Sequence, residues 1–567
     1  MKEKKWIRRP MPTRELLAEF SQQLNLNTYL TAILLQRGID TVDKAKDFFR
    51  PSLKHLHDPF LMKDMEAAVD RLRSALISNE KILIYGDYDV DGTTAVALVY
   101  RYLRGLKAKC EIYIPDRNKE GYGISQAGVE WAAENNFSLV IALDCGIKAS
   151  DMVMLGSHKG LEFIICDHHL PDDKIPNAVA VLDPKREDCP YPYKELSGCG
   201  LGFKLLQGYA SRYEDESTIL QYIDLVAVSI ASDIVPITGE NRILAHFGLK
   251  KLNEDPLPGL KALREIAAIK NELDVSGIVF YLGPRINAAG RVAHGSAAVD
   301  LLTAETDEEA TVLAEGVNIK NDLRREFDAS ITEEAIALIE GDDVLREAKS
   351  TVLFKNTWHK GVIGIVAARC IEKYYRPTVI LTESNEKITG SARSVNGFNV
   401  YEAILHCSDL LEKFGGHKYA AGLTMQRENL EAFRERFEDY VSRTITDEMT
   451  VPVIEVDTPI VFDRITSKFM SILKQMAPFG PENQRPVFEA SRVYVINSLT
   501  TFKDRHIRFQ AAQEGSENIF QAVGFDLASH YELLASGSTF RMAFTIEENV
   551  FNGNTSLQLK VKDIKAE

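Results

Sequence analysis

The sequence lacks any run of about 18 apolar residues, so no segment is predicted to cross a membrane as a helix. Its seven cysteines form no C-x-x-C pair and are not spaced as in a secreted disulfide framework, which favours a reducing compartment and gives no zinc motif. The basic start, MKEKKWIRRPMP, leads into an amphipathic pattern and not into the apolar stretch of a signal peptide. We therefore expect a cytoplasmic protein that is neither secreted nor bound to a membrane.

An excess of positive charge is also missing, since the 567 residues carry a formal net charge of −15. This excludes a nonspecific polycation, but a local basic channel can still bind nucleic acid on an acidic protein. A chain of this length exceeds what one hydrophobic core serves, and it should divide into roughly three to five domains.

Residues 81–92, KILIYGDYDVDG, place Asp87, Asp89 and Asp91 at the end of an apolar strand pattern. Carboxylates this close repel one another unless a cation neutralises them, which indicates a metal site. An EF-hand begins with the same D-x-D-x-D-G pattern but needs a glutamate at its twelfth position, where this sequence has Leu98. The strand-like flank also differs from the helix that precedes a calcium loop, so we reject a calcium site.

Strand and helix patterns alternate between about residues 60 and 210, which indicates βαβ units and a doubly wound parallel sheet. Ligands of such sheets gather at the carboxyl ends of the strands, and here the strand ends are rich in acids and imidazoles. The residues at these ends are Asp87, Asp89, Asp91, Asp144, Asp167, His168, His169 and Asp183. Asp233, at the end of the apolar stretch 225–236, is expected to join them.

Carboxylates and imidazoles without a thiolate suit Mn²⁺ or Mg²⁺ better than a structural zinc ion. More ligands are present than one ion needs, so the pattern predicts two ions that share a carboxylate and hydrolyse a phosphoester by in-line attack. Taken singly, each aspartate has an equally good explanation as a turn or helix cap. Asp183, which precedes Pro184, is interpreted in that way.

Residues 1–60 read as short helices, 61–299 as an α/β domain, 300–345 as one or two connecting helices, 346–445 as a second α/β domain and 450–567 as a small β-barrel. An OB-fold fits the barrel and would bind single strands, although a purely structural β domain shows the same pattern. In the second α/β domain, GGHKYAAG predicts a small-residue helix with Gly415, Gly416 and His417 before it, where backbone N–H groups can meet an anion.

The motifs GDYDVDG, DCG, DHH and SDIVP together resemble the DHH phosphoesterase superfamily, and PRINAAGR, GSARS and GGHKYAAG resemble its RecJ branch. This resemblance spans nearly the whole chain and implies DHH, DHHA1 and OB domains. It also implies a 5′-to-3′ exonuclease that is specific for single-stranded DNA, depends on Mn²⁺ or Mg²⁺, and acts in DNA repair and recombination.

Two other functions stay open beside the exonuclease. One is a DHH phosphoesterase that acts on short oligonucleotides or small phosphate compounds, although such chains generally end after the DHHA1 part. The other is an inactive nucleic-acid-binding scaffold, which loss of the motif acids would mark and which the intact acids here disfavour.

By position, the resemblance implies Asp89, Asp91, Asp144, His168 and Asp233 as metal ligands, with Asp87 uncertain. Asp144 is the expected bridging ligand and, with His168 and His169, forms the predicted catalytic set. His168 is expected to bind metal directly, whereas His169 is expected to contact the substrate phosphate or assist the leaving group. Asp167 is expected to orient an imidazole.

An exonuclease needs a feature that internal phosphodiesters lack, and a terminal 5′-phosphate offers extra charge that planar guanidinium groups bind bidentately. Each arginine alone could instead be solvated or stabilise a turn. The residues predicted to bind substrate are Arg117, Arg285, Asn287, Ser391, Arg393, Gly415, Gly416 and His417. We expect single-stranded DNA as the partner of a monomer, with a single-strand-binding protein and a helicase as further partners.

Overall fold

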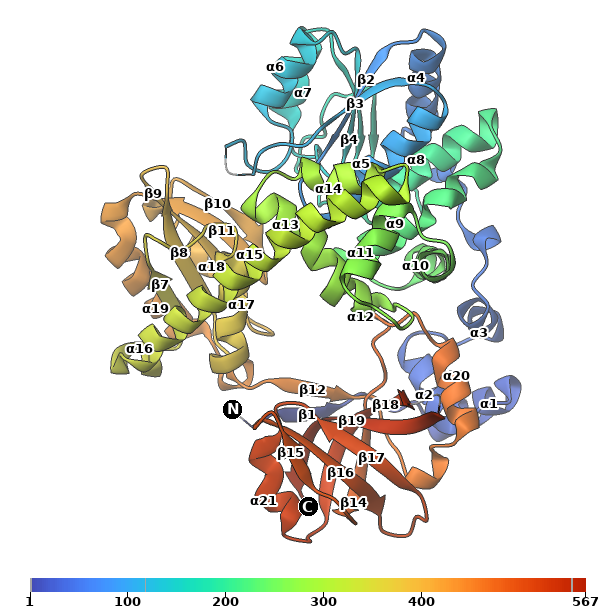
Figure 1. The fold of residues 1–567 in the computed structure, drawn as a ribbon, viewed down its shortest axis with the longest axis vertical. Helices are drawn as coiled ribbons and strands as arrows, with labels where there is room; N and C mark the ends of the chain where they lie inside the picture. Colours follow the sequence, from blue (N-terminus) through green and yellow to red (C-terminus); the bar gives the residue numbers. More distant parts are fainter. Residues whose placement is uncertain (1–2, 118, 552–553) are drawn as a thin grey trace. The chain divides into compact units, whose positions relative to one another are not determined.

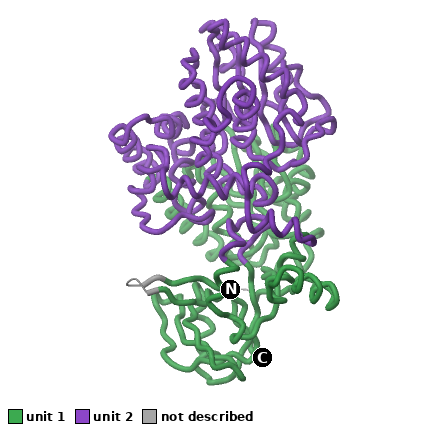
Figure 2. Tube along the Cα trace, turned by 90° about the vertical axis from the view of Figure 1, so that its right-hand side faces the viewer, with its two compact units in different colours: residues 1–38, 323–473, 486–567 green, residues 39–322, 474–485 purple. Residues whose placement is uncertain are grey.

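The computed structural model describes residues 3–117, 119–551 and 554–567. Two compact units make up the chain, and Figure 2 shows them in separate colours. Unit 1 comprises residues 1–38, 323–473 and 486–567, and unit 2 comprises residues 39–322 and 474–485. Within the described ranges, no helix has both the length and the apolar character needed to span a bilayer.

Unit 2 is built around a parallel sheet in the order β3-β2-β4-β5-β6 (Figure 1). The strands are β2 (Lys81–Gly86), β3 (Lys109–Tyr113), β4 (Leu139–Leu143), β5 (Glu162–Cys166) and β6 (Ala180–Leu182). The chain passes from β2 to β3 on one side and then adds β4, β5 and β6 on the other, so the order reverses between β2 and β4. This confirms the doubly wound sheet, whose ligand sites lie at the carboxyl ends near the reversal.

Helices cover both faces of this sheet because its strands are apolar on both sides. Ile82 and Ile84 contribute to the core that includes α4 (Met65–Ile77), α5 (Val90–Gly105) and α8 (Gly198–Tyr213). Leu83 and Tyr85 point to the opposite face, where the core includes α6 (Gln126–Glu134) and residues of α7 (Ser150–His158). The alternation along β2 thus fixes the strand between two helical layers and holds its acidic end in place.

Helices form the rest of unit 2. They are α3 (Val42–Phe49), α9 (Ile223–Ser232), α10 (Gly239–Glu254), α11 (Pro258–Ile266), α12 (Val275–Gly277), α13 (Gly283–Val292) and α14 (Ser296–Thr303). A π-helical turn, η4 (Ile278–Leu282), joins α12 to α13. The long helix α15 (Asp307–Glu340) spans most of the segment in which one or two connecting helices were predicted.

Residues 474–485 contain the prolines and the glycine that are typical of a domain boundary, yet they belong to unit 2. The Arg242 side chain on α10 is buried and donates to the backbone carbonyls of Met476, Ala477 and Pro478 and to that of Phe48. The backbone N–H of Ile237 donates to the carbonyl of Pro481 at 2.9 Å. These hydrogen bonds hold residues 474–485 against the start of α10.

Unit 1 contains a mixed sheet in the order β10-β11-β9-β8-β7. Its strands and main helices are β7 (Thr351–Phe354), α17 (Ile363–Tyr374), β8 (Thr378–Ser384), β9 (Lys387–Arg393), α18 (Val400–Leu405), β10 (Lys413–His417), β11 (Ala420–Met425) and α19 (Leu430–Thr444). The α/β pattern predicted for this part of the chain is confirmed.

The prediction of a small-residue helix in GGHKYAAG is wrong, because β10 and β11 form an antiparallel hairpin there. Ala421 and Leu423 point into the core and alternate with the exposed Gly422. This period of two is the period of a strand, and core packing overrides the helix preference of the alanines. Gly415, Gly416 and His417 therefore lie on a strand and do not begin a helix.

A β-barrel ends unit 1, with the strand order β13-β14-β18-β19-β17-β16-β15 and an additional β14–β16 pairing. Its strands are β13 (Thr458–Pro459), β14 (Phe488–Val495), β15 (Thr500–Phe502), β16 (His506–Gln513), β17 (Ile519–Gly524), β18 (Phe540–Phe551) and β19 (Asn554–Ala566). Helices α1 (Arg14–Leu24) and α2 (Thr28–Gln36) form as predicted. The sequence did not predict β1 (Lys5–Arg8), which pairs in parallel with β12 (Val453–Val456).

Candidate metal centre

Asp87, Asp89 and Asp91 follow β2 and lead into α5. Asp89 caps this helix, since its Oδ1 accepts a hydrogen bond from the backbone N–H of Gly92 at 3.1 Å. Asp91 lies in the first turn, where it is buried and accepts 2.7 Å hydrogen bonds from the backbone N–H groups of Gly198 and Cys199 and from Ser229 Oγ. The start of α8 and one hydroxyl of α9 therefore hold the Asp91 carboxylate in one orientation.

Asp144 follows β4 in a left-handed conformation, with φ of 58°. The helix α8 begins directly against it, and a Cβ at Gly198 would lie 2.6 Å from the Cβ of Asp144. Only glycine permits this approach, so Gly198 sets the distance between α8 and the carboxylate. The sequence signal was SGCG immediately before an apolar helix pattern, which we did not connect to the site.

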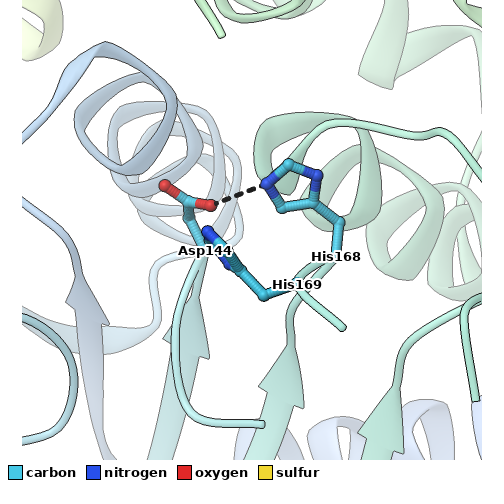
Figure 3. A group of neighbouring side chains, drawn as sticks. All are labelled: Asp144, His168 and His169. Carbon is cyan, nitrogen blue, oxygen red and sulfur yellow. Dashed lines mark ion pairs between the residues drawn. The ribbon is translucent and has the colours of Figure 1, made fainter. Parts of the chain in front are cut away.

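His168 follows β5 and points its ring toward the carboxylate of Asp144 above the strand ends (Figure 3). Its Nε2 lies 3.2 Å from Asp144 Oδ1, 3.5 Å from Asp233 Oδ2 and 3.7 Å from Asp91 Oδ2. Asp233 caps the carboxyl end of α9, so the apolar stretch that precedes it is a helix. The His168 imidazole thus lies close to carboxylates from three separate segments of the chain.

Among the described residues, the side chains form three overlapping groups whose ligand atoms lie within 4.8 Å of one another. The groups are Asp87, Asp89 and Asp144; Asp91, His168 and Asp233; and Asp144, His168 and His169. We call these seven residues the metal edge. Asp144 shares one group with Asp87 and Asp89 and another with His168, which is the position that a bridging ligand requires. Asp87, uncertain from the sequence, lies among the other acids.

Several electron-pair donors at the metal edge are buried without a hydrogen-bond partner in the described structure. They are Asp87 Oδ1, Asp144 Oδ1 and both ring nitrogens of His168. Buried polar atoms nearly always have a partner, so these atoms need an explanation. Carboxylate oxygens and imidazole nitrogens that converge in this way fit divalent cations such as Mn²⁺ or Mg²⁺.

Electrostatics supports the same interpretation. Burial, together with the neighbouring Asp91 and Asp89, raises the pKa of Asp144 well above its ordinary value and that of Asp233 to about 9. Burial and the Asp89 charge likewise raise the pKa of Asp87. The raised pKa values favour the protonated carboxyls unless a cation offsets the repulsion, so metal binding competes with protonation.

The two histidines have opposite surroundings. Burial lowers the pKa of His168, which favours the neutral ring that binds metal. Burial also opposes charge on His169, but its hydrogen bond to Asp167 and the nearby carboxylates outweigh burial and raise its pKa. The His169 Nδ1 lies 2.8 Å from Asp167 Oδ1, and its side chain is 44% exposed. Asp167 therefore orients an imidazole as predicted, and it favours the protonated form of that partly exposed ring.

Arg117 lies close to the metal edge, with its guanidinium 5.1 Å from the centre of the Tyr88 ring and its charge lowering the pKa of Asp87. Arg285 and Asn287 lie on α13, which approaches the same loop closely. A Cβ at Gly290 of this helix would lie 2.7 Å from the Tyr88 carbonyl oxygen. Arg285 is held by Asn318 Oδ1 at 3.0 Å and by the Tyr281 carbonyl at 2.7 Å.

Of the other predicted substrate residues, Ser391, Arg393, Gly415 and His417 lie on one face of the mixed sheet in unit 1, and Gly416 does not. Arg393 on β9 is opposite Ala420 on β11, which is opposite His417 on β10, and Ser391, Gly422 and Gly415 form the parallel row. Residues directly opposite across antiparallel strands share a face. We call Ser391, Arg393, Gly415, His417 and Gly422 the glycine face. Gly416 points to the other side, where a Cβ would lie 2.4 Å from the Ala420 carbonyl oxygen.

The glycine face has features of an anion site. Arg393 Nη1 donates to Ser391 Oγ at 3.0 Å, and both side chains lie at the start of α17, where a Cβ on Gly364 would be 2.8 Å from either. A helix start, a guanidinium group, a hydroxyl and an imidazole thus surround exposed glycines that leave room for a ligand. Gly364 was missed because GVIGIVAAR gives only a helix pattern.

Two further residues near the metal edge were not predicted. The Tyr122 hydroxyl donates to the Asp144 carbonyl at 3.0 Å and lies 3.2 Å from His169 Nδ1. Lys185, in the turn after β6, places its charge near His168 and Asp233 and opposes protonation of both. Asp183 accepts a 2.7 Å hydrogen bond from the Lys185 backbone N–H, as expected of a turn residue.

Three family models match successive parts of this chain. The DHH family N-terminal domain matches residues 81–230, the DHHA1 domain residues 347–443 and the RecJ OB domain residues 456–563. The single-stranded-DNA-specific exonuclease RecJ of Bacillus subtilis is 34% identical over 557 residues, which cover 97% of this chain and 70% of that protein.

Two crystal structures of RecJ from Thermus thermophilus also resemble the chain. The complex with Mn²⁺ has a TM-score of 0.85 at 26% identity and covers 99% of this chain and 80% of its own. The complex with Mg²⁺ has a TM-score of 0.79 at 25% identity and covers 99% and 78%. The fold, the metal edge and the extent of the similarity together place this chain in the RecJ family.

Proposed function

We propose that this protein is a 5′-to-3′ exonuclease that degrades single-stranded DNA with two divalent ions, Mn²⁺ or Mg²⁺, in DNA repair and recombination. The observation that carries the proposal is the convergence of buried, unpartnered carboxylate and imidazole atoms at one edge of the parallel sheet. The relatives named as single-stranded-DNA-specific exonucleases, and the RecJ structures with Mn²⁺ and Mg²⁺, support the substrate and the metals.

One proposed ion position uses Asp87, Asp89 and Asp144, and the other uses Asp91, His168 and Asp233. Asp144, which lies beside both, is the proposed bridge. When bound, the ions neutralise the phosphate and activate water for in-line attack. The start of α8 and Ser229 fix the Asp91 carboxylate, so the ligand set is organised before the substrate arrives.

His169 is the proposed contact to the reacting phosphate. Its raised pKa favours a proton on the ring, and its side chain is 44% exposed, whereas His168 and Asp144 are buried. Asp167 Oδ1 and the Tyr122 hydroxyl both lie within hydrogen-bond distance of Nδ1, which fixes the orientation of the ring. The imidazolium can thus stabilise charge on the phosphate or protonate the leaving oxygen.

The 5′-to-3′ polarity requires recognition of a strand end. We assign this role to Arg393 and Ser391 of the glycine face, with Gly415 and His417 beside them. Arg117, near the metal edge of unit 2, is a separate proposed contact to a substrate phosphate. Arg285 and Asn287 on α13 are the proposed contacts to the following nucleotides. A terminal phosphate has more unblocked oxygens than an internal one, which suits a bidentate guanidinium group.

The wider setting follows from the same proposal. The proposed enzyme acts as a monomer in the cytoplasm, and its seven free, buried cysteines suit that compartment, since thiols stay reduced there. A single-strand-binding protein and a helicase are the proposed partners, because both generate or hold the single strands that the enzyme consumes.

Incubation of a 5′-labelled single strand and its duplex with Mn²⁺, with and without a chelator, tests the function. We expect rapid release of label from the single strand alone and no reaction with the chelator. Comparison with a 3′-labelled strand fixes polarity, since a 5′-to-3′ enzyme releases the 3′ label last. Equal degradation of single strand and duplex, or of neither, would contradict the proposal, and cleavage of dinucleotides alone would favour the short-oligonucleotide phosphoesterase.

A further inference from the structure

Three of the large apolar side chains that unit 2 exposes lie in two short segments, residues 232–237 and 275–283. Phe280 is 72% exposed, Tyr281 is 50% exposed and Ile234, which directly follows Asp233, is 64% exposed. Most large apolar side chains of unit 2 lie instead in its cores. Exposed apolar side chains that cluster near a site for a polymeric substrate indicate a binding surface.

Close contacts place the two aromatic residues alongside the Asp233 loop. A Cβ at Gly283 would lie 3.1 Å from Ser232 Oγ, just before Asp233. At the other end, a Cβ at Gly480 would touch both Ile237, at 2.5 Å, and Val275, at 3.5 Å. Residues 275–283 therefore run beside residues 232–237, and Phe280 and Tyr281 fall in the stretch that accompanies Ile234.

The backbone holds these side chains outward in unusual conformations. Phe280 and Tyr281 lie within the π-helical turn η4, a rare form that occurs often at functional sites. Ile234 has φ of 61°, a left-handed conformation that a β-branched residue adopts only when its surroundings require it. Arg285 fixes the turn further, because its Nη1 donates to the Tyr281 carbonyl at 2.7 Å.

From this arrangement we propose that Phe280 and Tyr281, with Ile234, form a shelf on which nucleobases of the single strand stack beside the metal edge. The inference rests on the proposed function and adds base contacts to it. Aromatic faces bind bases of any sequence, which suits an enzyme that must advance along every strand. The bases of a duplex are already paired and stacked, so the shelf also favours single strands.

The charges around the shelf favour a nucleotide over an apolar protein segment. Arg285 lies one turn beyond Tyr281, and Asp233 with its proposed ion lies beside Ile234. A nucleotide offers a phosphate to the cations and a flat apolar base to the rings. An apolar helix of a partner protein would match the rings alone.

The test combines ring variants with single strands that lack one base. A series of 5′-phosphorylated oligonucleotides carries one abasic nucleotide, moved position by position from the 5′ end. For the wild-type enzyme, we expect kcat/KM to fall roughly tenfold when the missing base is the one on the shelf. Phe280→Ala should lose about the same factor on the intact strand and show no further loss at that position. Phe280→Trp should keep the wild-type profile.

Val312→Ala, at a side chain of unit 2 that is 69% exposed on α15, is the matched control and should behave like wild type. A wild-type profile that is flat at every position, or a Phe280→Ala enzyme that loses the same factor on intact and abasic strands alike, would overturn the shelf. Unchanged kcat/KM in Phe280→Ala and Tyr281→Ala would overturn it as well. Failure of the proposed function is a separate result, because wild type would then degrade no strand.

Discussion

The metal edge of unit 2 and the glycine face of unit 1 are built on opposite principles. The metal edge brings buried carboxylates so close that their pKa values rise, and it needs cations to hold them ionised. The glycine face is an open sheet surface with a guanidinium group, an imidazole and a helix start around exposed glycines, and it is suited to an anion. The residues proposed to cleave the phosphate and those proposed to hold its end therefore belong to different units of the chain.

This difference makes distinct kinetic roles testable. Damage to the metal edge should remove chemistry for every substrate, because each ligand serves the ions. Damage to the glycine face should depend on the substrate, because a phosphate contact matters only when that phosphate is present.

The largest effect is expected for Asp144→Ala. The variant removes the ligand that lies beside both proposed ion positions. Loss of a hydrogen bond that only orients a metal ligand lowers activity roughly 10- to 100-fold, so loss of Asp144 itself should lower the rate by more than that. Release of nucleotides from a 5′-phosphorylated single strand measures it, with circular dichroism to verify the fold. Asp183→Asn is the matched control, since Asp183 is also buried at a strand end but belongs to no ligand group, and its rate should stay close to wild type. Full activity in Asp144→Ala would exclude the assignment.

A chain cut after residue 450 should lose more than the barrel. It would remove residues 474–485 and leave the buried guanidinium of Arg242 without the carbonyls of Met476, Ala477 and Pro478. A hydrogen bond to a charged group contributes about 1.5–3 kcal/mol, so unit 2 should unfold at lower temperature or denaturant concentration. Urea unfolding of the cut chain, of Arg242→Met and of wild type measures this. Equal midpoints for the cut chain and wild type would show that the segment is a passive linker.

Arg393→Ala should separate the two regions most clearly. Loss of a hydrogen-bonded charge contact costs roughly 1.5–3 kcal/mol, or about 10- to 100-fold in kcat/KM, on 5′-phosphorylated strands. Strands with a 5′-hydroxyl should be affected much less, and Mn²⁺ binding should stay normal. Arg427→Ala, at an exposed arginine of the same unit, is the control. If both kinds of strand slow by one factor, Arg393 is a general backbone contact.

The smallest effect concerns the pH dependence of the metal-free protein. The pKa of Asp233 is about 9 in the fold, whereas an unfolded aspartate titrates near about 4. Between these values the folded chain binds more protons than the unfolded chain, so the free energy of unfolding should fall as pH rises, by at most about 1.4 kcal/mol per pH unit for one carboxyl. Urea titrations in a chelator should show a shallower slope for Asp233→Asn. Identical slopes for variant and wild type would mean that Asp233 titrates normally.

The sequence predicted the metal edge better than the glycine face, for a physical reason. Acids at the ends of apolar strands are local patterns, and the topology of a parallel sheet brings them together without further information. The hairpin of Gly415 and Gly422 depends on pairing with β9 and on a core that alanines fill, and neither is visible in GGHKYAAG. Hydrogen bonds from backbone groups, such as those from Gly198 and Cys199 to Asp91, also cannot be predicted from residue type, because every residue except proline has the same backbone N–H group.

Calorimetric titration of Mn²⁺ into the metal-free protein at neutral pH tests the central claim most directly. The metal edge predicts two ions per chain, with protons released on binding because carboxyls of raised pKa must ionise. Asp144→Asn should weaken both binding events, since this residue lies beside both positions, and Asp183→Asn should leave them unchanged. Binding of a single ion, or two ions whose affinities Asp144→Asn does not alter, would contradict the account.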